Sequence, residues 1–104
     1  MEQTDFNHLT WFRIVAEERS FTKAAARIGV AQSTLSHTIK QLEARMGIRL
    51  LTRTTRNVAT TAAGERLLHT ITPRMAEIED EIAALMEFRD KPSGSIKLRW
   101  NMKP

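Results

Sequence analysis

A polar helix face between residues 32 and 46 carries the side chains best suited to chemistry in this sequence. At about 100° per residue, Leu35, Ile39, Leu42 and Met46 fall on one side of a helix, which predicts a buried face. The opposite side is polar, made largely of short side chains and nearly free of acidic groups. Its members, including those at the helix start, are Gln32, Ser33, Thr34, Ser36, His37 and Lys40.

Short amide, hydroxyl and imidazole side chains let a helix backbone approach a major groove and pair with base edges. We therefore predict base contacts from Gln32, Ser33, Ser36 and His37, with glutamine able to bind adenine through two hydrogen bonds. Thr34 lies at the helix start, where free backbone N–H groups favour a phosphate. The alternative interpretation is an ordinary solvated face.

Two arginines, Arg53 and Arg56, flank a threonine-rich turn. An arginine there can enter the narrow, electronegative minor groove beside the major groove that the helix occupies. The alternative is a pair of surface arginines that serve solubility. Thr22, Lys23 and Lys40 are further candidates, in their case for contacts to DNA phosphates.

A second set of residues indicates pairing between chains. Apolar positions recur at spacings of 3, 4, 3, 4 and 3, which is the a/d pattern of a coiled coil. This heptad stripe consists of Leu68, Ile71, Met75, Ile78, Ile82 and Leu85. Packing against the chain's own domain could explain the first two positions, but not easily the last three, so we predict a dimer contact.

Catalytic and metal sites find little support. The sequence has no cysteine, and its three histidines, at positions 8, 37 and 69, are far apart. Glu65 and His69 share a helix face but make an incomplete ligand set. The four glycines form no phosphate-binding loop. We therefore expect no enzyme activity, no catalytic residue, no metal and no cofactor.

The elements that position these residues follow from capping and turn signals. A first helix is expected from Thr4 or Asp5 to about Glu18, with Phe6 and Phe12 facing the core. Ser20 caps a short helix over residues 22–28, and Gly29 begins a tight turn to a third helix over residues 32–46, which ends at Gly47. Helix, glycine turn and helix form the helix-turn-helix pattern.

The rest of the chain predicts a β-hairpin and a long helix. Residues 48–53 and 58–60 are expected to be strands around the turn at residues 54–57. Thr61 caps a helix of about 28 residues that contains Pro73 and stops before Lys91. Residues 95–100 alternate like a strand with no partner, which indicates the start of a further domain.

Charge is distributed unevenly along the 104 residues. Residues 1–60 carry nine Lys or Arg against five Asp or Glu, residues 61–90 three against seven, and residues 91–104 four against none. A basic N-terminal part followed by an acidic helix suggests that one surface binds a polyanion and that the other does not. The acidic, polar start lacks a secretory signal, and no apolar run is long enough for a bilayer, so we expect a cytoplasmic protein.

Several motifs together resemble the LysR-type transcriptional regulators of bacteria. They are Phe12 to Ile28 (FRIVAEERSFTKAAARI), Ala31 to Glu43 (AQSTLSHTIKQLE), Arg49 to Arg53 (RLLTR) and Thr61 to Gly64 (TAAG). The resemblance covers about residues 6–90. It departs at Ala31 and Ser33, where serine and proline are common, at His37, where arginine is frequent, and at Leu51, where phenylalanine is.

The resemblance implies a mainly α winged helix-turn-helix with a small β-hairpin wing over residues 1–60, followed by a linker helix for dimerisation over residues 61–90. Residues 91–104 would be a hinge and the first strand of a two-lobed effector-binding domain, where a small-molecule effector would bind. Antiparallel linker helices would join a homodimer whose recognition helices enter successive major grooves of a pseudo-palindromic site on double-stranded DNA. The rival hypothesis is a coiled-coil adaptor for protein partners, with an incidental basic surface and at most weak, sequence-independent affinity for duplex DNA.

Overall fold

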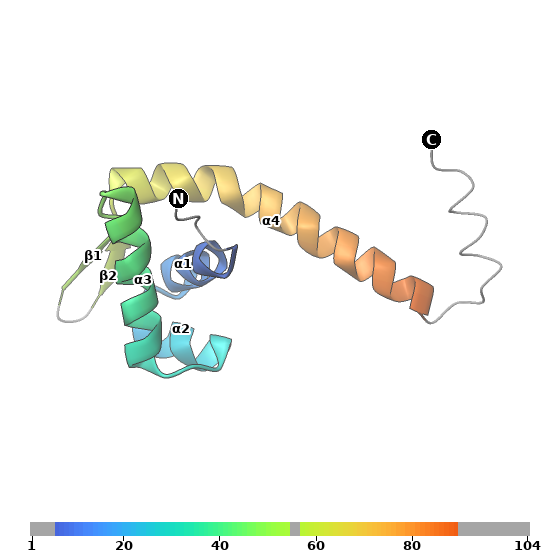
Figure 1. Ribbon diagram of the computed structural model, residues 1–104, viewed down its shortest axis with the longest axis horizontal. Helices are drawn as coiled ribbons and strands as arrows, with labels where there is room; N and C mark the ends of the chain where they lie inside the picture. The colour runs from blue at the N-terminus through green and yellow to red at the C-terminus, as the bar shows by residue number, and fades with distance from the viewer. Residues whose placement is uncertain (1–5, 55–56, 90–104) are drawn as a thin grey trace. The chain divides into compact units, whose positions relative to one another are not determined.

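The structure, a computed structural model, describes residues 6–54 and 57–89, and the chain divides into two compact units, residues 1–72 and 73–104. Its elements run in the order α1 (Phe6–Glu18), α2 (Phe21–Ile28), α3 (Gln32–Met46), β1 (Leu51–Arg53), β2 (Val58–Thr60) and α4 (Ala62–Arg89) (Figure 1). The predicted fold class, a mainly helical winged helix-turn-helix with a long last helix, is confirmed. The predictions for Thr4, Asp5, Arg56 and residues 95–100 lie outside the described residues.

The helix-turn-helix is defined by its caps. Ser20 precedes α2, and its Oγ accepts a hydrogen bond from the backbone N–H of Lys23 at 3.1 Å. Gly29 follows α2 with a left-handed φ of 91°, and Gly47 follows α3 with a φ of 68°. Left-handed backbone suits glycine because it has no Cβ. The predicted caps and both ends of α3 are confirmed, and α2 begins one residue earlier than predicted.

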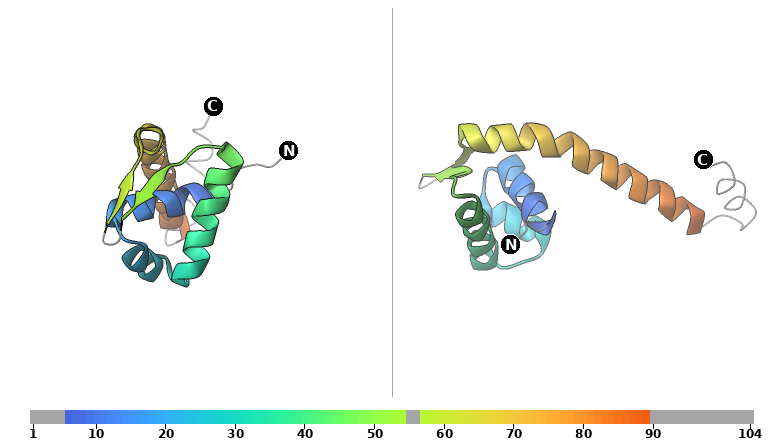
Figure 2. Two further views of the ribbon diagram at one scale, coloured as in Figure 1. Left: turned by 90° about the vertical axis from the view of Figure 1, so that its left-hand side faces the viewer. Right: turned by 45° about the horizontal axis from the view of Figure 1, so that its top comes forward.

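The core of the first unit lies among α1, α2 and α3, which pack against one another (Figure 2). Phe12, Val15, Leu35 and Leu42 are completely buried, and Ala24 allows the helices to approach closely. The expected core role of two other residues is wrong. Phe6 is 48% exposed and Met46 is 36% exposed, because each stands at the end of its helix, beyond the cover of its neighbours.

The wing is a two-stranded antiparallel hairpin that pairs Leu51 with Thr60 and Arg53 with Val58. Its first strand starts at Leu51, three residues later than predicted. The backbone of Leu50 explains the difference, since its N–H donates to the Glu43 carboxylate at 2.8 Å and its carbonyl accepts from the Thr61 N–H at 3.0 Å. Residue 50 therefore joins α3 to the start of α4.

Helix α4 begins as predicted, with Thr61 as its cap. The Thr61 hydroxyl accepts from the Gly64 N–H at 3.0 Å and donates to the Arg49 carbonyl at 2.7 Å. Glycine is needed at position 64, because a Cβ there would lie 2.2 Å from the Leu50 carbonyl oxygen. Among the described helices, α4 included, none is long and apolar enough to span a membrane.

Replacing Gly64 with alanine is expected to lower the free energy of unfolding by about 1–3 kcal/mol, the usual cost of overpacking. The methyl group would push α4 away from Leu50 and stretch the hydrogen bond from Thr61. Thermal unfolding measures this loss. Alanine favours a helix over glycine by up to about 1 kcal/mol, so a variant more stable than the parent would contradict the close approach. Ala62→Gly, at an exposed position in the same turn, measures helix propensity alone.

An ionic cluster links the ends of α1 and α2. Arg27 donates to Glu17 at 2.8 Å and to Glu18 at 3.1 Å, and Arg13 donates to Glu17 at 2.6 Å. Partial burial alone would raise the pKa of Glu17, but the hydrogen bonds from Arg27 and Arg13 outweigh it and hold that pKa below its usual value. The cluster therefore fixes α2 against α1 without using any residue of the predicted DNA-contacting set.

Candidate nucleic-acid interface

The predicted recognition face of α3 is open to solvent. Leu35, Ile39 and Leu42 are buried and hold the helix against α1 and α2. Ser36 is half-buried on the other side, and the remaining predicted contacts on this helix are exposed: Gln32, Ser33, Thr34, His37 and Lys40. Ala31 offers no side-chain cap, so the first backbone N–H groups of α3 are available to an acceptor from outside.

Gln32 is held by a residue of the preceding helix. The Thr22 hydroxyl donates to the Gln32 Oε1 at 3.1 Å and thereby links the first turn of α2 to the first turn of α3. The structure thus places Thr22, a predicted phosphate contact, against a predicted base contact. Lys23, the other candidate on α2, is exposed beside it.

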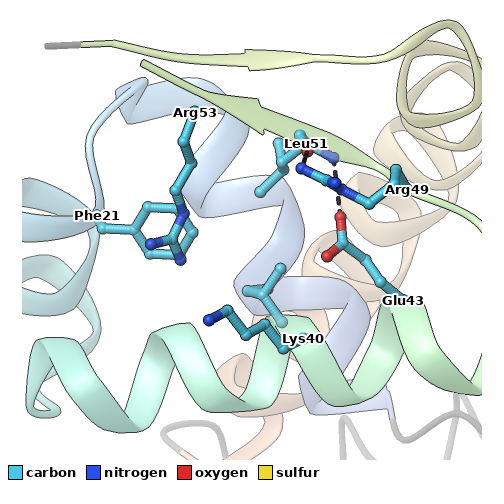
Figure 3. Close-up of a pocket in the computed structure, with 7 residues that line it drawn as sticks. Phe21, Lys40, Glu43, Arg49, Leu51 and Arg53 are labelled. Carbon is cyan, nitrogen blue, oxygen red and sulfur yellow. Dashed lines mark hydrogen bonds between the residues drawn. The ribbon is translucent and has the colours of Figure 1, made fainter. Parts of the chain in front are cut away.

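Arg53 lies against α3. Its Nη2 is 2.5 Å from the Ser36 Oγ. Figure 3 shows its guanidinium over the Phe21 ring, with the guanidinium carbon 3.8 Å from the ring centre. The structure therefore brings together Ser36, predicted to read a base, and Arg53, predicted to enter the minor groove. Phe21 was not among the predicted site residues, and its position at the start of α2 gave no signal of this contact.

A pocket of about 360 Å³ separates α3 from β1 in the first unit (Figure 3). Phe21, Ile39 and Leu51 supply its apolar wall, and Lys40, Arg49 and Arg53 bring three basic side chains around it. Such a basic pocket beside the exposed polar face of α3 suits a polyanion.

Glu43 also lines this pocket, and one of its carboxylate oxygens is used for hydrogen bonds within the chain. Its Oε2 accepts from the backbone N–H groups of Leu50 and Leu51, at 2.8 and 3.0 Å. Arg49 donates to the Leu51 carbonyl at 3.5 Å. Sequence reasoning missed both roles, although Glu43 is the one acidic residue between residues 32 and 46, which could have signalled a structural acceptor.

The heptad stripe on α4 divides into two parts. Ile71 and Met75 are 8% and 3% exposed within the single chain, and Leu68 is half-buried. The stripe's last three residues are exposed large hydrophobic side chains, as is Met86, which the heptad spacing did not include. Their exposed fractions are 43% for Ile78, 51% for Ile82, 52% for Leu85 and 49% for Met86.

A protein-family model described as "Bacterial regulatory helix-turn-helix protein, lysR family" matches residues 6–65. The chain is 47% identical over 98 residues to the HTH-type transcriptional regulator PgrR of Escherichia coli, a match that covers 94% of this chain and 33% of PgrR. It is 37% identical to the HTH-type transcriptional regulator PtxR of Pseudomonas aeruginosa, with 94% of this chain and 31% of PtxR covered. The chain thus spans about a third of the length of these relatives, which are transcription regulators rather than enzymes.

Among solved structures, the BenM DBD in complex with catB site 1 DNA superposes with a TM-score of 0.75 at 32% identity, covering 86% of this chain and 99% of that one. Full-length CbnR complexed with its target DNA matches with a TM-score of 0.68 at 30% identity, covering 82% of this chain and 29% of CbnR. The arrangement of helices and wing described above is therefore one that occurs in proteins bound to DNA.

Proposed function

The chain belongs to the lysR family of bacterial regulatory helix-turn-helix proteins, and on this basis we propose that it binds double-stranded DNA as the sequence-specific part of a transcription regulator in the cytoplasm. The observation that carries the proposal is the exposed polar face of α3, on a fold that superposes with BenM DBD bound to DNA. The chain would contribute recognition and no catalysis.

We assign base contacts to Gln32, Ser33, Ser36 and His37. Gln32, Ser33 and His37 are exposed and Ser36 is half-buried at the first turns of α3, and their hydroxyl, amide and imidazole groups suit base edges. Lys23, Thr34 and Lys40 would bind phosphates, which fix the position of a protein on the duplex without reading its sequence. We include Thr22 and Arg53 in this set, and their contacts to Gln32 and Ser36 support that choice.

The proposed organisation assigns residues 1–60 to the winged helix-turn-helix, residues 61–90 to a linker helix and residues 91–104 to a hinge before a further domain, where any small-molecule effector would act. We also propose a homodimer through the linker helix. The exposed Ile78, Ile82 and Leu85 support it, because large apolar side chains in register gain free energy when a partner helix covers them. Two recognition helices would then occupy successive major grooves of a pseudo-palindromic site.

Selection of binding sites from random duplexes, followed by titration of the selected site, tests this function. We expect the double variant Ser36→Ala, His37→Ala to lose roughly 1–3 kcal/mol of discrimination for each good base contact removed. Affinity for random duplex should change little, because phosphate contacts dominate it. Equal weakening on selected and random duplexes would contradict the assignment of base contacts to this face.

The same titration separates DNA binding from the adaptor hypothesis, which the exposed apolar side chains at the end of α4 also fit. A protein-interaction adaptor would show at most weak affinity that is indifferent to sequence, and the selection would yield no consensus. Enrichment of a defined site would exclude the adaptor as the main function.

A further inference from the structure

We propose that Arg53 is a positioning residue that sets the base preference of the recognition helix through Ser36, so that Ser36 reads a hydrogen-bond acceptor, as on the major-groove edge of guanine. This inference rests on the proposed function and specifies the chemistry of one of its contacts. It also gives Arg53 a different role from entering a minor groove.

The chemistry of the two groups dictates the direction of their hydrogen bond. A guanidinium has five N–H donors and no acceptor, whereas a serine hydroxyl has one donor and two acceptor lone pairs. At 2.5 Å from the Ser36 Oγ, the Arg53 Nη2 must therefore use a lone pair of that oxygen. The hydroxyl proton of Ser36 remains free to be donated.

Charge strengthens the same preference. A cation beside the Ser36 oxygen favours a partner that carries partial negative charge and disfavours a second donor. In the major groove, guanine presents two acceptors, N7 and O6, whereas cytosine presents its N4 amino donor. Ser36 next to Arg53 is therefore expected to donate its hydroxyl proton to guanine. It should disfavour cytosine at the base position that it faces.

Arg53 is held in this position by more than one contact. Its guanidinium carbon lies 3.8 Å from the centre of the Phe21 ring, a distance suited to a cation–π contact. Phe21 is 6% exposed, so the ring is fixed in the core and offers a rigid surface. Arg53 also pairs with the buried Val58 in the hairpin, which anchors its backbone. Reaching into a minor groove would require Arg53 to give up both Ser36 and Phe21.

The experiment begins with binding sites selected by the unaltered chain. Ser36→Ala first identifies the base pair whose preference depends on Ser36. Arg53→Gln is then expected to reduce the preference for guanine over cytosine at that pair by about tenfold, the effect of weakening one base-edge hydrogen bond. In a Ser36→Ala background the same change should leave that preference unaltered.

Two further variants separate orientation from charge. Arg53→Lys keeps the positive charge that Arg53→Gln removes, so its affinity for random duplex should match that of the parent. We expect it still to lose the preference for guanine over cytosine, because an ammonium group lacks the plane that stacks on Phe21. Arg49→Gln is the matched control, since it removes a positive charge beside the same pocket while the contact of Arg53 to Ser36 stays intact. It should weaken all duplexes alike. Thermal unfolding confirms that each variant is folded.

Several results would overturn the inference. Arg53→Gln could weaken all duplexes equally, which would make Arg53 a plain phosphate contact. Its effect could instead depend on A·T-rich flanks, which would return it to the minor groove. Full rescue by Arg53→Lys, or a Ser36→Ala variant with unchanged preferences, would also refute it. Failure of the proposed function is distinct, because the selection with the unaltered chain would then yield no site at all.

Discussion

A chain carrying both Ile78→Lys and Ile82→Lys is expected to be a monomer and to bind its selected duplex about 10²- to 10⁴-fold more weakly than the parent. The two isoleucines are 43% and 51% exposed in the single chain, so their replacement should not disturb the core of the first unit, residues 1–72. Lysine would bring an unpaired charge into an apolar contact, which is costly. Loss of the dimer removes the high effective concentration of the second half-site, while the preferred half-site sequence should stay the same.

Sedimentation measures the oligomeric state, and duplex titration measures the affinity. Thermal unfolding shows whether the first unit, residues 1–72, stays folded. The matched control is Ala76→Lys with Ala83→Lys, which adds the same charge at two exposed positions on the other side of the same helix. This control should remain a dimer with nearly unaltered affinity. An isoleucine variant that still pairs would show that the heptad stripe is not the interface. A monomer that binds the full site as tightly as the parent would show that pairing does not serve recognition.

Removing the carboxylate of Glu43 is expected to destabilise the fold strongly. Its Oε2 accepts from the N–H groups of Leu50 and Leu51, whose residues are 2% and 4% exposed. Glu43→Ala would leave both amides buried without an acceptor, at about 1–3 kcal/mol for each. We therefore expect the free energy of unfolding to fall by roughly 2–6 kcal/mol, measured by denaturant or thermal unfolding.

Glu43→Gln is the control for this variant, because both hydrogen bonds end on one oxygen atom that an amide carbonyl can replace. Glutamine should retain most of the stability that alanine loses. Equal destabilisation by the two variants would show that the negative charge, and not the acceptor, is what the backbone requires. A stable Glu43→Ala variant would mean that solvent reaches the two amides.

Helix boundaries were predictable wherever a local signal set them. Gly29 and Gly47 stand where the helix backbone turns left-handed, and Ser20 and Thr61 cap the helices that follow them. The buried side of α3 followed from helical periodicity, apart from Met46 at its end. These features depend on residues a few positions apart, which a sequence displays directly.

Contacts between elements could not be predicted in the same way. The start of β1 depends on Glu43, eight residues earlier, and the position of Arg53 depends on Ser36 and on Phe21 in another helix. Helical periodicity assigns each of these residues to a face, but it does not say which faces meet. For the same reason, the heptad spacing left open whether Ile71 packs within its own chain, and it did not reveal that Met75 is also buried there.

The completely buried core has a consequence for the protein at low copy number. Phe12, Val15, Leu35 and Leu42 are all enclosed by residues of the same chain, so folding of this unit is a first-order process whose midpoint does not depend on protein concentration. The proposed pairing through α4 would be second-order and would weaken on dilution. A freshly made chain would therefore fold and resist proteolysis before it meets a partner, and subunits could exchange between dimers without unfolding.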